Sequence, residues 1–138
     1  MAVVPDISPE QCWAALRTQP DAVMVDVRTD AEWNFVGLPD LSAAGKRPVL
    51  ISWQLYPSMQ VNPRFLDMLA QAGVTPDHAV YFLCRSGARS LAAAQAAQAA
   101  GYGRVFNVAD GFEGPLDAEG HRGRLAGWKA AGLPWVQR

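Results

Sequence analysis

Residues 81–90 join an apolar strand, a short loop and the start of a helix in the sequence Tyr81-Phe82-Leu83-Cys84-Arg85-Ser86-Gly87-Ala88-Arg89-Ser90. The strand is predicted at residues 79–83, which are continuously apolar, as is typical of a strand buried on both faces. A loop with one glycine follows, and an alanine-rich helix is predicted at residues 89–100, closed by Gly101. This order is typical of parallel α/β sheets, which bind ligands at the carboxyl ends of their strands.

Glycines and prolines divide the rest of the chain into similar alternating units. Ser8 and Gln11 have the spacing of a capping box, with a proline between them, which predicts a helix to about residue 19. Asn62 and Pro63 open another helix by the same rule, and Gly73 ends it. Further strands are predicted at residues 22–27, 48–53 and 105–108, and further helical segments at residues 30–35 and 124–131. Because these strands lack polar alternation, we predict an α/β fold with a parallel sheet covered on both faces by helices.

The composition is typical of one globular domain. The chain has 138 residues, half of them hydrophobic, and a net charge of -1. We find no repeat or linker, which predicts a single domain over residues 1–138. Without a basic surface, no nucleic-acid partner is expected. The longest weakly polar stretch, residues 91–101, is too short to span a bilayer, and the N-terminus lacks the pattern of a signal peptide, so we expect a cytoplasmic protein without a membrane partner.

Cys84 lies where three sources of positive charge meet. Backbone N–H groups of the loop can form an anion-binding nest, and the N-terminus of the following helix adds partial positive charge. Arg85 and Arg89 add two full charges nearby. All three favour the thiolate, which is the nucleophilic form of cysteine, and the same cradle suits an anionic substrate. We therefore interpret Cys84 as the catalytic residue. The expected substrate-binding residues are Arg85, Ser86, Gly87, Ala88, Arg89 and Ser90.

Other residues that can carry chemistry favour structural roles. Cys12 lies beside Trp13 on the first predicted helix, where we expect it to fill the core. His78 lies near the start of the strand that ends at Cys84, and His121 lies in a glycine-rich loop, so no general base is evident. No Cys/His cluster has the spacing of a metal site, and we expect neither a metal nor a cofactor.

Asp26 and Arg28 lie at the end of the strand predicted at residues 22–27. A buried carboxylate costs free energy unless it is paired. We therefore expect these two residues to form a structural ion pair or loop anchor behind the site, without a direct part in catalysis. Trp33 and Trp53 follow strand ends, which makes them candidates for the pocket wall.

Three segments together resemble the rhodanese family, and the resemblance covers nearly the whole chain. Residues 84–90 are similar to its active-site loop in the form Cys-Arg-Ser-Gly-x-Arg-Ser. Asp26-Val27-Arg28, with Glu32, resembles the upstream Asp-x-Arg motif of the family, and residues 127–134 resemble its C-terminal segment. Two departures affect the pocket rim: residues 37–40 lack the histidine of Gly-His-Ile-Pro-Gly, and Gly111-Phe112 replaces a Gly-Gly pair. Residues 113–123 also look extended.

The resemblance implies a three-layer fold with about five parallel strands and helices on both faces. It also implies sulfur transfer in two steps, in which a small anionic donor such as thiosulfate forms a persulfide on Cys84. The acceptor is then a thiol, cyanide or a protein.

Two alternatives stay open: a phosphatase or arsenate reductase that uses the same loop, and a rhodanese-like binding or sensing module without turnover. Related phosphatases have five residues between the cysteine and the arginine, whereas four lie between Cys84 and Arg89. The shorter loop fits a single sulfur better than a tetrahedral phosphate. Binding modules of the family commonly lack the cysteine, which this chain has.

Overall fold

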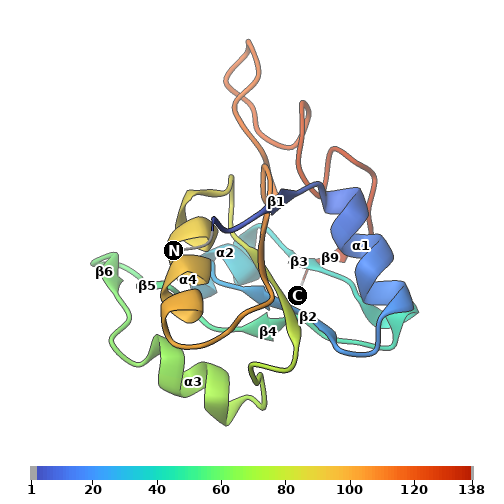
Figure 1. Cartoon of the computed structure of the whole chain (residues 1–138). Helices are drawn as coiled ribbons and strands as arrows, with labels where there is room; N and C mark the ends of the chain where they lie inside the picture. Colours follow the sequence, from blue (N-terminus) through green and yellow to red (C-terminus); the bar gives the residue numbers. More distant parts are fainter. Residues whose placement is uncertain (1–2, 138) are drawn as a thin grey trace.

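The computed structural model describes residues 3–137 and is built on a parallel sheet of five strands (Figure 1). Neighbouring strands pair in the order β1-β8-β7-β2-β4, and every pair is parallel. In that order, the strands are Asp6–Ile7, Val105–Val108, Ala79–Leu83, Ala22–Asp26 and Val49–Leu50. Strand β7 lies at the centre, so the residues that follow it reach the middle of the carboxyl edge.

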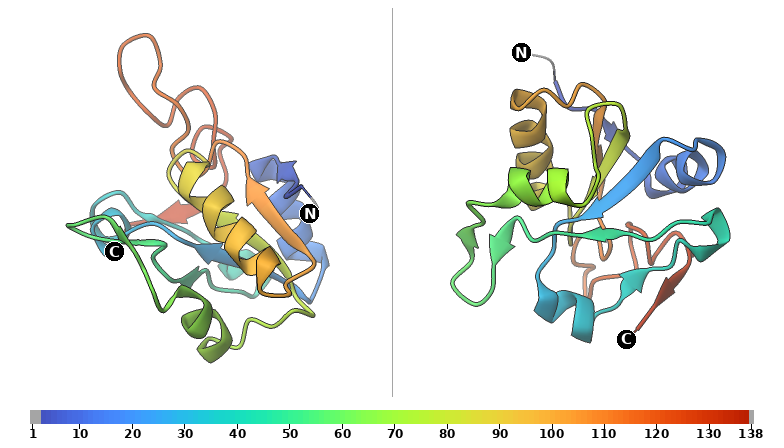
Figure 2. Two further views of the ribbon diagram at one scale, coloured as in Figure 1. Left: turned by 60° about the vertical axis from the view of Figure 1, so that its left-hand side comes forward. Right: turned by 90° about the horizontal axis from the view of Figure 1, so that it is seen from below.

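Helices cover both faces of this sheet, as predicted. Helices α3 and α4 lie on one side and α1 on the other (Figure 2). The helices are α1 (Pro9–Thr18), α2 (Asp30–Phe35), α3 (Phe65–Gln71) and α4 (Ala88–Ala99), with a short 3-10 turn at Ser42–Ala44. Alternation along β7 separates two cores: Val80 and Phe82 pack with α3 and α4, whereas Tyr81 and Leu83 pack with α1. No helix in the described part of the chain is long and apolar enough to cross a membrane.

Local capping explains where the helices begin. At α1, Ser8 Oγ accepts the Gln11 N–H at 3.0 Å and Gln11 Oε1 accepts the Ser8 N–H at 2.9 Å, which confirms the predicted capping box. The prediction that Asn62 caps a helix is wrong. Its side chain accepts the Arg64 N–H at 3.0 Å and closes a turn, so α3 begins only at Phe65.

The C-terminal segment differs most from prediction, because residues 124–131 form turns and the predicted helix is absent. Gly127 has a φ of +102°, outside the helical region, and a Cβ there would contact the carbonyl oxygen of Gly111 at 3.0 Å. Trp128 is fully buried, and its indole N–H donates to the carbonyl of Pro134 at 2.6 Å. Burial of Trp128 therefore decides the path of this segment. Beyond it, β9 (Trp135–Val136) pairs with β3 (Leu38–Pro39).

Two excursions extend from the sheet. The hairpin of β5 (Gln54–Leu55) and β6 (Gln60–Val61) projects from one side of the molecule in Figure 1. The segment 113–123, which looked extended in the sequence, forms the projecting loop at the top of that view. Its ends are tied together, since the Gly123 N–H donates to the carbonyl of Glu113 at 2.6 Å.

Candidate active site around Cys84

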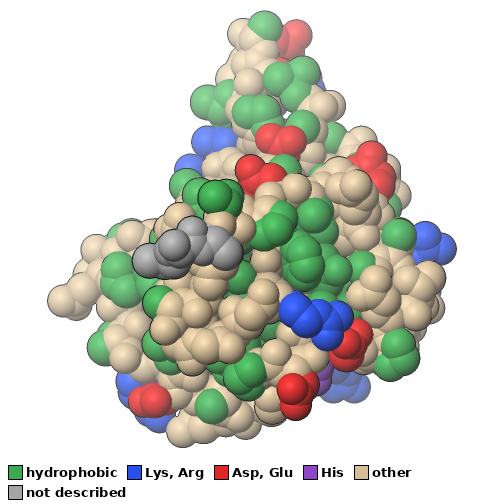
Figure 3. Space-filling model, in the orientation of Figure 1, with side chains coloured by type: hydrophobic (Ala, Val, Ile, Leu, Met, Phe, Trp, Pro, Cys, Tyr) green, Lys and Arg blue, Asp and Glu red, His purple; other side chains and the backbone are tan. Residues whose placement is uncertain are grey.

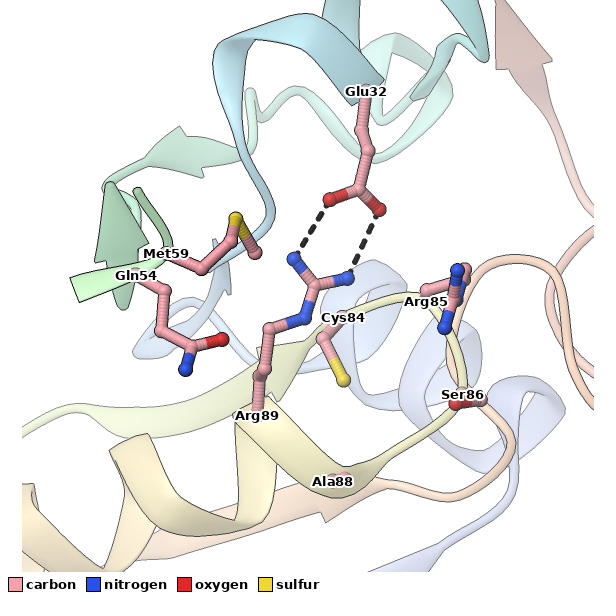
Figure 4. Close-up of a pocket in the computed structure, with 8 residues that line it drawn as sticks. All are labelled: Glu32, Gln54, Met59, Cys84, Arg85, Ser86, Ala88 and Arg89. Atoms are coloured by element: carbon pink, nitrogen blue, oxygen red, sulfur yellow. Dashed lines mark hydrogen bonds and ion pairs between the residues drawn. The ribbon is translucent and has the colours of Figure 1, made fainter. Parts of the chain in front are cut away.

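Cys84 directly follows β7 and lies at the base of a pocket of about 310 Å3. The hairpin and α2 supply one part of the wall, and the loop with the start of α4 supplies the other (Figure 4). The lining residues are Glu32, Gln54, Met59, Cys84, Arg85, Ser86, Ala88 and Arg89. The structure therefore brings most of the predicted loop to one cavity.

The Cys84 sulfur has polar neighbours although the residue is only 1% exposed. The Gly87 N–H donates to Sγ at 3.1 Å, and Ser90 Oγ lies 3.1 Å from Sγ. Gly87 has a φ of +115°, a left-handed conformation that favours glycine and aims this N–H at the sulfur. Ser90 is buried behind the sulfur and does not line the cavity.

Ser90 is held from the neighbouring strand by Asn107, a residue that sequence reasoning missed. Ser90 Oγ donates to Asn107 Oδ1 at 2.5 Å, and the Asn107 amide donates to Asp6 Oδ1 at 2.9 Å. The sequence signal that could have identified Asn107 is its position inside the apolar strand β8, because a buried amide requires hydrogen-bond partners.

The Arg89 guanidinium is paired with Glu32 and is not a free positive charge directed at the Cys84 sulfur. This pairing corrects the prediction that Arg89 adds a full charge to the anion-binding loop. The guanidinium donates to both carboxylate oxygens of Glu32, at 2.7 and 3.0 Å (Figure 4). Burial alone would raise the pKa of Glu32, but the bonds from Arg89 and the Thr29 N–H hold it below its ordinary value. Burial likewise works to lower the pKa of Arg89, but Glu32 outweighs it and the pKa is raised. Both groups are therefore ionised at neutral pH.

Glu32 is also positioned by its own helix. Thr29 Oγ1 accepts the Glu32 N–H, and the Glu32 carboxylate accepts the Thr29 N–H, so Glu32 completes a capping box at α2. This box was readable in the sequence, but the contact with Arg89, 57 residues away, was not.

The Cys84 loop is anchored from the segment after β8. The Phe112 N–H donates to the Cys84 carbonyl at 2.8 Å, and the Glu113 N–H donates to the Arg85 carbonyl at 2.9 Å. Gly111 approaches the loop so closely that a Cβ would collide with the carbonyl groups of Cys84 and Arg85. Gly111, which corresponds to the first glycine of the family's Gly-Gly pair, is thus required here. Phe112 replaces the second glycine, and its side chain is buried.

Asp26 and Arg28 form a fully buried ion pair and do not line the pocket. The Arg28 guanidinium donates to Asp26 Oδ2 at 2.7 Å and to the Gly37 carbonyl at 2.8 Å, and it lies 4.3 Å from the centre of the Phe112 ring. This geometry matches the expected ion pair and loop anchor. It ties the segment after β2 to the segment that supports the Cys84 loop.

The remaining candidates lie away from the cavity. Trp33 is buried and Trp53 packs edge-on against Phe65, and neither is among the lining residues, so the prediction that they form the wall is wrong. Cys12 lies on the buried face of α1 and is fully buried in the core, as predicted, and burial raises its pKa well above the usual range. His78 lies just before β7, whose length separates it from Cys84.

Comparison with known proteins places this geometry in a family. The family model described as "STR4 middle domain" matches residues 6–138. The chain is 36% identical to "Uncharacterized protein RP600" of Rickettsia prowazekii, over 96% of this chain and 98% of that protein. It is 28% identical to a protein named "Sulfurtransferase" of Allochromatium vinosum, over 97% and 96% of the two chains. It is 25% identical to "Rhodanese-like domain-containing protein 4, chloroplastic" of Arabidopsis thaliana, over 94% of this chain and 25% of that protein.

A solved structure confirms the fold. The crystal structure of Rv0390 from M. tuberculosis superposes with a TM-score of 0.88 at 48% sequence identity, and the match covers 99% of this chain and 100% of that one. Because the family model spans residues 6–138 and the relatives include a rhodanese-like protein and a sulfurtransferase, this protein belongs to the rhodanese-like family, in the group described by the STR4 middle domain.

Proposed function

We propose that this chain is a sulfurtransferase that carries a transferable sulfur on Cys84 as a persulfide. The observation that carries the proposal is the position of the Cys84 sulfur at the base of a cavity, 3.1 Å from the Gly87 N–H and near the Arg89 guanidinium. An N–H donor and a nearby cation stabilise a thiolate and, after transfer, the anionic outer sulfur of a persulfide. A relative named as a sulfurtransferase supports the same reaction class.

The proposed reaction has two steps, both at the outer sulfur atom. The Cys84 thiolate attacks the outer sulfur of thiosulfate, a new S–S bond forms, and the old S–S bond breaks with its electron pair leaving on sulfite. An acceptor such as cyanide or a thiolate then attacks the outer sulfur of the persulfide, and the electron pair returns to Cys84. In this scheme Arg85, Ser86, Gly87, Ala88 and Arg89 form the substrate-binding loop, and Ser90 supports the Cys84 sulfur from behind.

The phosphatase alternative lacks a proton donor in the described part of the pocket. Hydrolysis of a phosphate monoester needs an acid for the leaving group. Glu32 is the carboxyl group that lines the cavity, and its lowered pKa and its two bonds to Arg89 keep it ionised. We therefore expect negligible hydrolysis of an aryl phosphate in an assay run beside the thiosulfate reaction. Efficient hydrolysis that is lost in Cys84→Ser would favour the phosphatase instead.

A second candidate is a binding module without turnover, and one observation favours it: Cys84 is only 1% exposed. A donor must reach the sulfur through the cavity, whose opening the hairpin and the loop define. If the loop stays closed in solution, the thiol remains unreactive and the site serves recognition alone.

Intact-mass measurement after treatment with thiosulfate tests the proposal. We expect the mass to rise by one sulfur atom, and cyanide to remove that atom. Cys12→Ser is the matched control, because it retains Cys84 and should gain the sulfur as the parent does. Cys84→Ser should gain none. A protein that stays unmodified by thiosulfate and by other sulfane sulfur donors would contradict the proposal and support the binding module.

A further inference from the structure

The charge of the cavity is smaller than its two arginines suggest. Three charged side chains line it, Glu32, Arg85 and Arg89, so one net positive charge remains when all are ionised. Arg89 directs two N–H groups at Glu32, and its side chain passes Cys84 on the way to that carboxylate (Figure 4). A donor in this cavity therefore meets a carboxylate as well as guanidinium groups.

We propose that Glu32 selects donors by charge, so that the site takes a sulfane sulfur donor with one negative charge in preference to the doubly charged thiosulfate. This inference rests on the proposed function and names the donor class of the same site. Glu32 touches Arg89 rather than the sulfur, so it acts as a specificity-determining residue through its charge and through the guanidinium that it holds.

The charges gathered in the transfer step support this preference. The Cys84 thiolate and thiosulfate together bring three negative charges, and sulfite leaves with two. A thiosulfonate, R–SO2–S⁻, transfers the same outer sulfur, but only two negative charges meet and the sulfinate leaves with one. In both reactions one S–S bond forms and one breaks, and no proton or further reactant is needed. An organic hydropersulfide with a neutral organic group carries no charge or one negative charge, depending on its protonation, so that one or two negative charges meet when the thiolate is included.

Partial burial makes the Glu32 charge effective. The side chains of Arg89 and Glu32 are 16% and 19% exposed, so water screens them less than it screens surface charges. The lowered pKa of Glu32 means that its carboxylate is ionised at neutral pH. Because Glu32 offsets one of the two guanidinium charges, a second negative charge on the donor is stabilised less than it would be beside two free guanidinium groups, whereas a neutral substituent is unaffected.

The opposite wall suits a neutral substituent. Gln54 and Met59 of the hairpin carry no charge and face the cavity across from Arg85 (Figure 4). An organic group on the donor is able to contact the Met59 thioether, which is flexible and apolar, while the outer sulfur lies near Cys84.

Two donors of nearly equal shape provide the test. Methanethiosulfonate differs from thiosulfate by a methyl group in place of one anionic oxygen. We would measure kcat/KM for both donors, with cyanide as acceptor, in the parent and in Glu32→Gln. We would compare the ratio of the two kcat/KM values between the two proteins, because differences in the intrinsic reactivity of the donors then cancel. Glutamine keeps the capping box at Thr29, because its carbonyl oxygen accepts the same N–H.

We expect the parent to prefer methanethiosulfonate, and Glu32→Gln to shift the ratio toward thiosulfate by about tenfold, or about 1.4 kcal/mol. Glu10→Gln removes an equal charge from the exposed first turn of α1 and should leave the ratio unchanged. Glu32→Asp, which keeps the charge, should retain the preference and guards against a purely structural effect. As a readout without turnover, the dissociation constants of sulfate and methanesulfonate should shift in the same direction.

The outcomes separate the two proposals. Failure of both donors to place sulfur on Cys84 of the parent would overturn the proposed function and this inference with it. Sulfur loading from both donors, with the same ratio in the parent and in Glu32→Gln, would overturn charge selection alone. An equal shift in Glu10→Gln would also overturn it, because the effect would then belong to the net charge of the protein.

Discussion

The two cysteines are buried to nearly the same extent, yet their surroundings are opposite. Cys12 is 0% exposed and packs among apolar side chains on the buried face of α1, where burial raises its pKa. Cys84 is 1% exposed, but its sulfur receives the Gly87 N–H, lies beside Ser90 Oγ and opens onto a cavity. Exposure therefore does not distinguish a reactive thiol from a structural one, whereas the polar atoms within reach of the sulfur do.

Surface chemistry away from the cavity agrees with this contrast. The face shown in Figure 3 mixes apolar, acidic and basic side chains without a large field of one sign. The polar groups beside the Cys84 sulfur thus come from the loop and the start of α4. Substitutions that remove those local contacts should change the reactivity of Cys84 and leave that of Cys12 unchanged.

Exchange of each sulfur for oxygen should separate the two cysteines most clearly. In Cys84→Ser we expect sulfur transfer to fall by at least about 1000-fold, since the hydroxyl is not a comparable nucleophile. In Cys12→Ser the rate should stay within about twofold of the parent, because a core position contributes packing only. A thiosulfate:cyanide assay with purified, folded variants measures both. A large loss in Cys12→Ser with its fold intact would make Cys12 a participating thiol.

Alkylation should show the same contrast without any substrate. At neutral pH in the native state, iodoacetamide should label Cys84 on the order of 100-fold faster than Cys12, which is reached only when the core opens. Peptide mapping by mass spectrometry assigns the site. In denaturant the two rates should converge. Equal native rates would mean that the surroundings of the two thiols do not control their reactivity.

Removal of the Arg89 guanidinium should reduce the difference in reactivity between Cys84 and Cys12. In Arg89→Ala we expect sulfur transfer and native alkylation of Cys84 to slow by on the order of 10- to 100-fold, because a cation near the thiolate is lost. The variant also leaves the half-buried Glu32 carboxylate without its partner. Arg89→Lys should recover only part of the rate, since an ammonium group does not bond both carboxylate oxygens in one plane. Unchanged rates in Arg89→Ala would show that this arginine serves Glu32 alone.

Local sequence signals sufficed for most of the fold. The apolar run of β7 and the capping box of α1 depend on neighbouring residues, and both lie where they were predicted. The helix predicted at residues 124–131 failed because Trp128 is buried against a distant part of the chain, which overrides local propensity. The strand order was likewise beyond local patterns.

Prediction of the site had the same limit. Cys84 and its loop are contiguous, so a strand exit, a glycine and two arginines identify them without knowledge of the fold. The bond from Arg89 to Glu32 joins residues far apart in sequence, and it changes the charge that a donor meets. The contact of Asn107 with Ser90 also crosses between elements. Contiguous motifs therefore locate the Cys84 loop, whereas the charges around it need the tertiary structure.

The smallest predicted effect concerns the stability that Cys12 contributes as a function of pH. Its folded pKa is raised above the unfolded value, so the folded state keeps a proton that the unfolded state loses once the pH exceeds about 8.5. The contribution of Cys12 is therefore fully present below that pH and is lost as the pH rises, with a slope approaching about 1.4 kcal/mol per pH unit. Cys12→Ser lacks this titration.

Urea unfolding of the parent and of Cys12→Ser at pH 8 and pH 9.5 measures the difference, and Cys84 cancels because both proteins contain it. We expect the parent to lose about 1 kcal/mol more than the variant over this interval. Tyr81 also has a raised pKa, caused first by its burial and then by Cys12, and it is present in both proteins, so the part of its titration that burial causes cancels. Parallel losses in the two proteins would mean that the Cys12 thiol ionises as readily in the core as in the unfolded chain, and the contrast between the cysteines would then rest on Cys84 alone.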